Sequence, residues 1–395
     1  ATSFQEVGFE FDILTRYYDD DQREGKSMHI GSQSAKNYTA SYFRDGNILY
    51  TNFTEDTKER KCFEKLPPVV RGLYAYYKVD LYHYGWLNFV MEAFKKELIT
   101  KKYDYIFASY GPPVVLLAAR KLSRKFNIPW IADFRDIYID ERDTAFQLIA
   151  KKLTQEWILN TSSAIVFATD GMKDYFNRNA SIKLRNKENA VIYNGVVENS
   201  EGVSFNEDDA DVVDEFNQLF TKHDIVCLHT GTLYKAQNIS FFIDNCTRYN
   251  KANSNRVAIV FLGLSENEQL QKINAPFCYF LRKVSHNTSM FLQRLASGLI
   301  LPIWQNRYTG FSGKTFEYLY SGKWILSGPN PQKDLLKFFK AAGTVLVLAN
   351  YDDFSKAIEK LLIHKKWTPN PEYNSHLLFK RKYWNEQLIN FIKQL

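Results

Sequence analysis

Residues 311–329, FSGKTFEYLYSGKWILSGP, carry the residue types best suited to chemistry in this chain. A small, polar opening is followed by a helical pattern that begins near Gly313. The first N–H groups of a helix have no intrahelical partner and carry the positive end of its dipole, so they favour phosphate groups. Gly313 permits close approach of the backbone, Lys314 and Thr315 offer N–H groups, and Glu317 follows one turn later. The segment predicts a diphosphate site with a carboxylate beside it.

The same letters also resemble the end of a different phosphate motif, the P-loop G-x-x-x-x-G-K-[ST]. That motif needs a glycine at position 308, where this chain has Tyr308. It also needs a strand directly before the loop, whereas Asn306 to Gly310 separate the loop from the apolar run LPIW. The P-loop alternative is therefore disfavoured.

Short apolar runs alternate with helical patterns in two similar halves of the chain. Continuous apolar strands between helices indicate parallel sheets that are covered on both faces. The fold class predicted is α/β, with two doubly wound Rossmann-like domains facing across a cleft, where ligands bind at the carboxyl ends of strands. The expected strands are residues 9–15, 103–109, 128–134, 163–169 and 189–195 in the first half, and 224–231, 256–263, 277–284, 297–304, 323–329 and 342–349 in the second.

The expected domain boundaries follow from this alternation and from a shift in composition. Residues 1–200 form the first domain, which opens as though one strand–helix unit were missing, and residues 201–220 form an acidic linker. Residues 221–372 form the second domain, and residues 373–395 form an amphipathic helix that crosses back to the first.

Composition narrows the class of protein. Hydrophobic residues make up 45% and charged residues 24% of the 395 residues, as in folded soluble proteins. The net charge of +7 is too diffuse to indicate nucleic-acid binding, but suits an acidic ligand or an anionic membrane face. The four cysteines have neither metal-ligand spacing nor a disulfide framework, and no signal peptide or transmembrane run is recognisable. These features predict a cytoplasmic protein without a metal site.

Several segments, in their order and spacing, resemble the retaining two-domain (GT-B) glycosyltransferases of the group 1 or family 4 type. The similarity is strongest to the branch that builds bacterial surface polysaccharides, in which a strand ends in Asp-x-Arg-Asp and a helix opens Ser-x-Lys-x-x-Glu-Tyr. It runs from about residue 100 to about residue 350. The segments are YDYIFASYGPP (103–113), IPWIADFRDIY (128–138), SSAIVFATDGMKDY (162–175), VIYNGV (191–196), HTGTLYKAQ (229–237), VSHNTSMFLQRLASGLILPI (284–303) and SGKTFEYLYSGKWILSGP (312–329).

The resemblance implies a nucleotide-diphospho sugar as donor substrate, bound by the second domain, with no cofactor and no obligatory metal. It implies that Glu317 accepts hydrogen bonds from the ribose hydroxyls and that the backbone of Val284 contacts the base. The residues expected at the nucleotide sugar are Gly231, Thr232, Lys235, Val284, Gly313, Lys314, Thr315 and Glu317.

Three positions depart from the family pattern. Members often carry Gly-Arg-x-x-x-x-Lys where this chain has Thr232 and Gln237, and a glutamate where it has Thr309. The branch resembled commonly lacks that glutamate too. Lys235 could supply the missing positive charge at the diphosphate, or it could be a solvated turn residue.

On the acceptor side, the segment ADFRDIY places Asp133, Arg135 and Asp136 at or just beyond a strand end. Asp133 and Arg135 share one face of the strand and could pair. Asp136 could bind an acceptor hydroxyl or act as a base. The alternative is an Arg–Asp pair that only fixes the loop. Arg135, Asp136 and Lys235 are the candidate catalytic residues.

The activity predicted is that of a glycosyltransferase of hexosyltransferase type, retaining, with a saccharide or lipid-linked acceptor, in bacterial polysaccharide or glycan biosynthesis. Two alternatives stay open: a catalytically weak nucleotide-sugar-binding or scaffold subunit, and a GT-B nucleotide-sugar epimerase. The aromatic stretch 73–89 could touch the inner face of the cytoplasmic membrane, because Tyr and Trp favour interfaces, or it could be a packed helix.

Overall fold

The computed structural model divides the chain into two compact units. Unit 1 comprises Ala1–Ala168, Met172–Ile192 and Leu388–Leu395, and unit 2 comprises Thr169–Gly171 and Tyr193–Gln387. The residues described are 8–16, 42–45, 48–51, 67, 86–111, 114–136, 138, 145–180, 184–197, 204–234, 236–254, 256–263, 275–304, 310–363 and 377–395.

Unit 2 is built on a parallel sheet of six strands in the order β10-β9-β8-β11-β12-β13. All six strands expected in the second half are present, and the four inner ones are fully buried apolar runs. The order reverses direction between β8 and β11, and such a switch point opens a crevice at the carboxyl ends of the strands. The strands are β8 (Ile225–Thr230), β9 (Val257–Leu262), β10 (Cys278–Leu281), β11 (Gly298–Leu301), β12 (Ile325–Ser327) and β13 (Val345–Val347).

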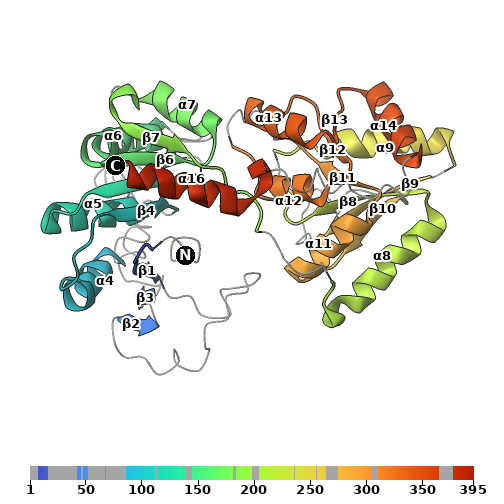
Figure 1. The fold of residues 1–395 in the computed structure, drawn as a ribbon. Helices are drawn as coiled ribbons and strands as arrows, with labels where there is room; N and C mark the ends of the chain where they lie inside the picture. Colours follow the sequence, from blue (N-terminus) through green and yellow to red (C-terminus); the bar gives the residue numbers. More distant parts are fainter. Residues whose placement is uncertain are drawn as a thin grey trace. The chain divides into compact units, whose positions relative to one another are not determined.

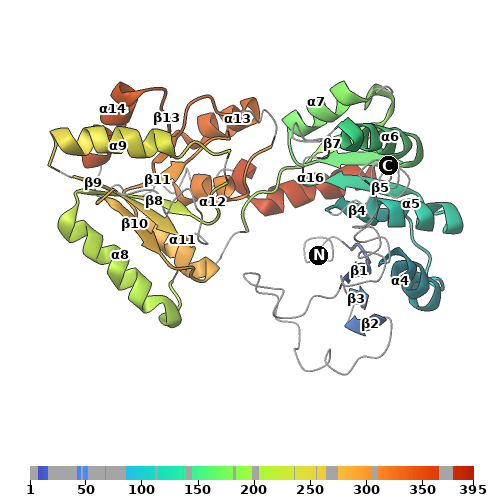
Figure 2. The ribbon, with the colours of Figure 1, turned by 180° about the vertical axis from the view of Figure 1, so that it is seen from behind.

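Helices cover both faces of this sheet. Figures 1 and 2 show α9 (Ser240–Ala252) and α14 (Tyr351–Ile363) on one face, and α8 (Ala210–Lys222) and α11 (His286–Leu295) on the other. The first pair packs its apolar side chains on the sheet in one core. Two further helices follow strands at the carboxyl edge: α12 (Lys314–Ser321) and α13 (Lys333–Ala342).

The acidic segment 201–220, expected as a linker, is an integral part of unit 2. It contains the 3₁₀ turn η5 (Glu207–Asp209) and most of α8. The buried face of α8 is formed by Val212, Val213, Phe216 and Leu219. These apolar positions recur with helical spacing, so acidic composition hid an amphipathic helix.

Unit 1 contains a four-stranded parallel sheet in the order β4-β5-β6-β7. The aromatic rings of Phe134, Phe167 and Phe176 pack against one another in its core. The elements are α4 (Trp86–Ala93), the π-turn η3 (Phe94–Leu98), β4 (Ile106–Tyr110), α5 (Val114–Phe126), β5 (Trp130–Phe134), α6 (Ala145–Thr161), β6 (Ala164–Phe167), α7 (Asp170–Asn179, whose first two residues belong to unit 2), η4 (Leu184–Asn186) and β7 (Glu188–Val191).

A separate three-stranded sheet, ordered β1-β3-β2, also belongs to unit 1. Strand β1 (Ile13–Arg16) was expected at residues 9–15, whereas β2 (Tyr42–Asp45) and β3 (Ile48–Thr51) were not expected. Strands β2 and β3 pair in antiparallel fashion, so this part of unit 1 is not doubly wound.

The C-terminal helix α16 (Arg381–Lys393) follows the 3₁₀ turn η6 (Leu377–Phe379). It begins in unit 2, and its last residues, from Leu388, belong to unit 1. Within unit 2 the amide of Val196 donates to Phe379 O at 2.7 Å, and the amide of Arg381 donates to Val196 O at 2.7 Å. This short ladder fixes the start of α16 against the backbone next to Gly195.

Candidate functional site

His229 lies inside the sheet, next to the carboxyl end of β8 at the switch point. Its side chain is fully buried, and Nδ1 lies 3.1 Å from Ile300 O on β11. A carbonyl oxygen can only accept, so Nδ1 carries the hydrogen and Nε2 is left as an acceptor. Burial and the nearby Lys314 ammonium lower the pKa of His229 to about 3. A neutral imidazole therefore stands beneath the site.

The Lys314 side chain reaches from the start of α12 back to the end of β8. Its Nζ donates to Thr230 O at 2.6 Å and to Thr232 O at 2.9 Å, and lies 3.4 Å from His229 Nε2. Burial lowers the pKa of Lys314 to about 8, while the Glu317 carboxylate opposes that shift. The result is a positive charge at the switch point, held by an arrangement that the sequence did not predict.

Gly231 follows β8 directly and adjoins this lysine. Its φ of +70° lies in the left-handed region that favours glycine. A Cβ at this position would lie 3.7 Å from Lys314 Nζ. The glycine of the GTLYKAQ segment is thus required by the left-handed backbone at the end of β8.

Tyr318 fixes α12 on β8. Its hydroxyl oxygen accepts from the Thr230 amide at 2.8 Å and lies 3.3 Å from Thr230 Oγ1. Tyr318 and Lys314 are four residues apart and so lie on the same face of the helix. Both side chains bind Thr230 of β8, so the start of the helix and the end of the strand are held together.

The backbone groups at the start of α12 differ in part from expectation. The Thr315 amide, expected to be available to a ligand, donates instead to Ser312 O at 3.0 Å in a tight turn. In the part of the chain that the structure describes, the amides of Gly313 and Lys314 have no hydrogen-bond partner. The half-buried Glu317 carboxylate likewise has no hydrogen bond or ion pair to any described residue. Two N–H groups and one carboxylate are thus available to a ligand.

The turn after β8 holds the two positions that depart from the family pattern. Gln237 is buried: its Oε1 accepts from the Tyr234 amide at 3.0 Å, and its Nε2 donates to Pro302 O at 3.3 Å. It therefore shapes the turn. Thr232 has an exposed side chain and contributes its carbonyl oxygen to Lys314. Lys235 and Thr309 lie outside the described residues.

Val284 lies in the loop between β10 and α11, at the same edge of the sheet. Its side chain is half-buried, and neither its N–H nor its C=O has a partner among the residues described. Gly263, at the end of β9, has a φ of +72°, and a Cβ there would lie 3.6 Å from Lys283 Cα. The cap of α11 is Ser285, whose side chain accepts from the Thr288 amide, whereas His286 is exposed.

The acceptor-side candidates lie in unit 1, at the end of β5. Arg135 Nε lies 2.9 Å from the Asp133 carboxylate, and its Nη1 donates to Ile192 O at 2.8 Å. Burial raises the pKa of Asp133, and Arg135 and Ser109 oppose that shift. Arg135 therefore makes the contacts expected if the Arg–Asp pair fixes the loop. Asp136 is exposed, with its Oδ2 3.8 Å from where a Cβ of Gly111 would stand.

Nowhere in the described ranges do three or more His, Cys, Asp or Glu side chains group in a way that could hold a metal ion. None of the described helices has the length and apolar character needed to span a membrane.

Comparisons with solved structures identify the fold. The chain is similar to HepE of Anabaena, crystallised with UDP (14% identity, TM-score 0.58, covering 78% of this chain and 82% of HepE). It is similar to sucrose-phosphate synthase from Thermosynechococcus elongatus, with 14% identity and a TM-score of 0.61, covering 99% of this chain and 90% of the synthase. It is also similar to an α,α-trehalose-phosphate synthase from Burkholderia vietnamiensis, with 11% identity and a TM-score of 0.58, covering 98% of this chain and 100% of that one. No protein-family model and no curated protein matches. The chain has the GT-B fold.

Proposed function

We propose that this GT-B protein is a glycosyltransferase that moves a sugar, with retention, from a nucleotide-diphospho donor to a saccharide or lipid-linked acceptor. The observation that carries the proposal is the Lys314 ammonium at the switch point of a parallel sheet. Its helix begins with two amides that have no partner among the described residues, and Glu317 follows one turn later. Solved structures of the similar HepE contain UDP, or UDP-glucose, which supports a nucleotide sugar as ligand here.

The arrangement suits stabilisation of a leaving diphosphate. Charge builds up on the diphosphate as the bond to the sugar breaks, and fixed donors lower the barrier if they are in place beforehand. The Gly313 and Lys314 amides are such donors. The Lys314 ammonium already contacts Thr230 O, Thr232 O and His229 Nε2, so it contributes its positive charge. Lys314 thus supplies the positive charge that the departures at Thr232 and Gln237 remove. Lys235 adds a second charge, and the exposed Asp136 of unit 1 receives an acceptor hydroxyl or its proton.

Glu317→Ala is expected to weaken nucleoside diphosphate binding by about 1–3 kcal/mol, which is roughly 5- to 150-fold, because a charged acceptor of two ribose hydrogen bonds is lost. Calorimetric titration with UDP, GDP, dTDP and CDP measures this loss and also identifies the base. Glu215→Ala, an exposed change on α8, is the control and should bind as the wild type does.

The same change should not weaken the binding of inorganic pyrophosphate, which has no ribose. Equal affinity of the variant and the wild type for every nucleotide would remove Glu317 from the ribose site. Release of free nucleoside diphosphate from donor plus acceptor separates an enzyme from a scaffold subunit, which would release the donor unchanged. Conversion of the sugar without transfer would indicate an epimerase.

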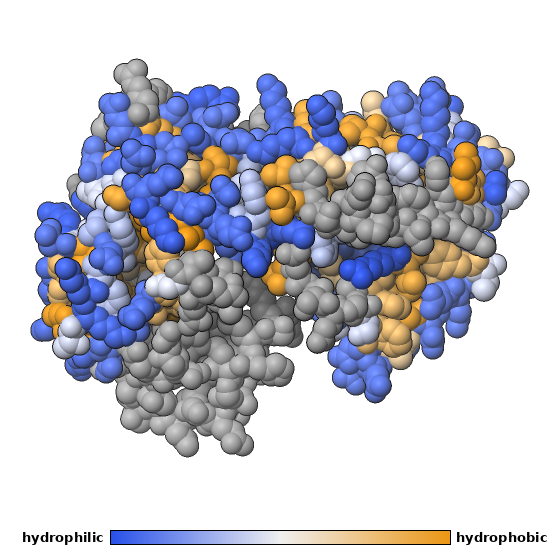
Figure 3. Space-filling model, in the orientation of Figure 1, coloured by the Kyte–Doolittle hydropathy of each residue, from blue (hydrophilic) through white to orange (hydrophobic). Residues whose placement is uncertain are grey.

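The pathway proposed is polysaccharide or glycan assembly at the inner face of the cytoplasmic membrane, with peripheral contact through unit 1. In the aromatic stretch 73–89, Trp86 and Leu87 are buried in the core beside α5, and residues 73–85 lie outside the described part. Support for contact comes from α6, where Ile149 is 53% and Leu153 41% exposed, four residues apart, beside an exposed Lys152. Figure 3 shows apolar residues of the described parts interspersed among hydrophilic ones on one face.

The double variant Ile149→Ser, Leu153→Ser is expected to lower binding to vesicles that contain anionic lipid by about tenfold or more, since each apolar side chain contributes about 1.5–3 kcal/mol when fully buried. Co-sedimentation with anionic and with neutral vesicles measures this. Phe220→Ser, on exposed α8 of unit 2, is the matched control. Unchanged binding of the double variant would rule out this face of α6.

A further inference from the structure

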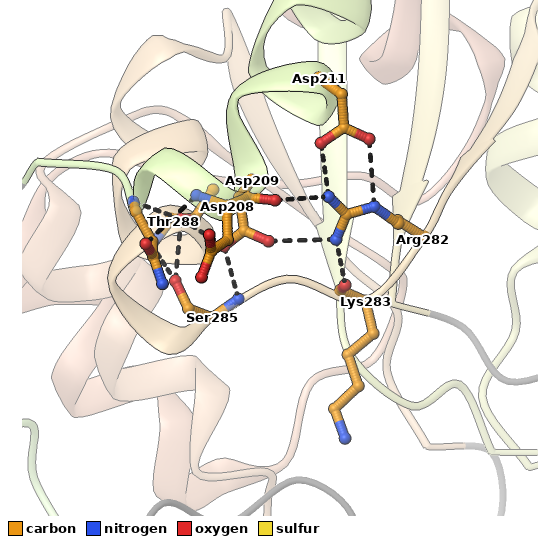
Figure 4. A network of polar contacts seen from close by, with 8 residues as sticks. Asp208, Asp209, Asp211, Arg282, Lys283, Ser285 and Thr288 are labelled. Carbon is orange, nitrogen blue, oxygen red and sulfur yellow. Dashed lines mark hydrogen bonds and ion pairs between the residues drawn. The ribbon is translucent and has the colours of Figure 1, made fainter.

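The buried carboxylate of Asp209 in η5 binds the loop that follows β10 (Figure 4). Its Oδ2 accepts from the Ser285 amide at 2.9 Å and from Thr288 Oγ1 at 2.7 Å. Its Oδ1 accepts from Arg282 Nη1 at 3.1 Å. One side chain from the segment before α8 thus holds the loop at its beginning, its end and the first turn of α11.

Arg282 closes this network from the strand side. Its guanidinium donates to the Asp211 carboxylate, with Nε at 3.2 Å and Nη2 at 2.5 Å, and to Asp208 O at 3.0 Å. Its Nη1 also donates to Lys283 O at 3.2 Å, so the side chain fixes the peptide next to its own. Asp209 and Asp211 hold the loop from Arg282 to Ser285 through four hydrogen bonds to its side chains and backbone. Asp209 accepts a fifth from Thr288 in the first turn of α11.

Asp209 acts here as an ionised group. Burial by itself would raise its pKa, but hydrogen bonds from Ser285, Thr288 and Arg282 hold the pKa below its usual value. A carboxylate can accept from all of these donors, whereas an amide would turn a donor of its own toward them. Loss of the charge would therefore loosen the loop rather than leave it in place.

The loop lies where the far end of a bound nucleotide would be. Two strand spacings, about 10 Å, separate β10 from β8, at whose end Lys314 lies. Helix α11, which starts at this loop, contacts α12, which carries Glu317. Between the fixed Lys283 and Ser285, the N–H and C=O of Val284 have no partner among the described residues. A donor and an acceptor on one residue complement an acceptor and a donor on the edge of a base, such as O4 and N3–H of uracil.

We propose that Asp209 is the positioning residue for nucleobase recognition: it holds the loop so that the peptide groups of Val284 face the hydrogen-bonding edge of the base of a nucleoside diphosphate. This inference rests on the proposed function and assigns the segment before α8 to the donor site. Asp209 itself does not touch the ligand.

The test compares Asp209→Asn with Asp224→Asn in the full chain. Asp224 accepts a hydrogen bond from Arg256 Nε at 2.6 Å. Both residues directly precede strands of the same sheet, at the amino ends of β8 and β9, so this variant controls for the loss of an ion pair in unit 2. Dissociation constants are measured for UDP and for inorganic pyrophosphate, which has no base. Asp209→Asn should weaken the binding of UDP at least tenfold, or by about 1.4 kcal/mol, and should leave the dissociation constant of pyrophosphate within about twofold of the wild type. The differences in affinity among UDP, GDP, dTDP and CDP should also become smaller. Asp224→Asn should change neither.

Equal losses for UDP and pyrophosphate would show that Asp209 only maintains the fold, and an unchanged affinity for UDP would equally overturn the inference. In both cases binding by the wild type would leave the proposed function standing. Absence of nucleotide binding by the wild type would overturn both together. If Asp209→Asn does not fold, Thr288→Val, which removes one donor to the same carboxylate, must show the same selective loss.

Discussion

Lys314→Ala is expected to lower the affinity for a nucleoside diphosphate by about 1.5–3 kcal/mol, which is roughly 10- to 150-fold. The ammonium belongs to the first residue of α12, whose amide and that of Gly313 have no partner among the described residues, and alanine removes the charge together with its bonds to Thr230 O and Thr232 O. Titration with UDP, UMP and uridine should show the largest loss for UDP and almost none for uridine. Equal losses for all three would mean that Lys314 only supports the fold.

The same lysine gives the site a specific pH dependence. Burial lowers the pKa of Lys314 to about 8, against 10.5 for a free lysine. Because a diphosphate prefers the charged ammonium, its affinity should fall as the pH rises above about 8. A bound anion raises the pKa of the lysine, so the affinity should decline at a higher pH than the pKa of the free protein indicates. Lys314→Arg, whose guanidinium stays protonated, should bind without this decline. A flat profile for the wild type would contradict the assignment.

Gly195→Ala is expected to cost about 3 kcal/mol or more of the free energy of unfolding. A Cβ at residue 195 would lie 2.6 Å from Arg381 N and 2.7 Å from Lys380 C, both backbone atoms that no rotamer change can move. The φ of +62° adds a strain of about 1 kcal/mol for any side chain. The start of α16 would have to separate from Val196 to make room.

Urea unfolding followed by circular dichroism measures this cost. Gly313→Ala is the control for stability, since its φ of −56° is helical and a Cβ there meets nothing within 4 Å. That change should leave the free energy of unfolding within about 0.5 kcal/mol. A cost below about 1 kcal/mol for Gly195→Ala would show that the ladder between Val196 and α16 is not part of the stable fold.

Local pattern alone determined the sheet of unit 2 and the helix that follows its switch point. Apolar runs such as 225–230 and 257–262 are buried on both faces, and a parallel sheet between two helix layers is the arrangement that buries them. The hairpin of β2 and β3 was missed although a signal exists: Gly46-Asn47 separates two short runs, a common two-residue hairpin connection.

Only the tertiary structure decided what the site residues touch. Tyr318 and Thr230 are 88 positions apart, and Asp209 and Thr288 are 79 apart. The helical period places Lys314 and Tyr318 on one face but cannot say that this face meets β8, because the strand order sets that contact. Likewise, the sequence showed that Gln237 replaces a lysine, yet only the fold showed that its amide holds the turn. The hydrophobic periodicity of a sequence indicates which side chains are buried. It does not indicate which side chains they contact, because those contacts join residues that are distant in the chain.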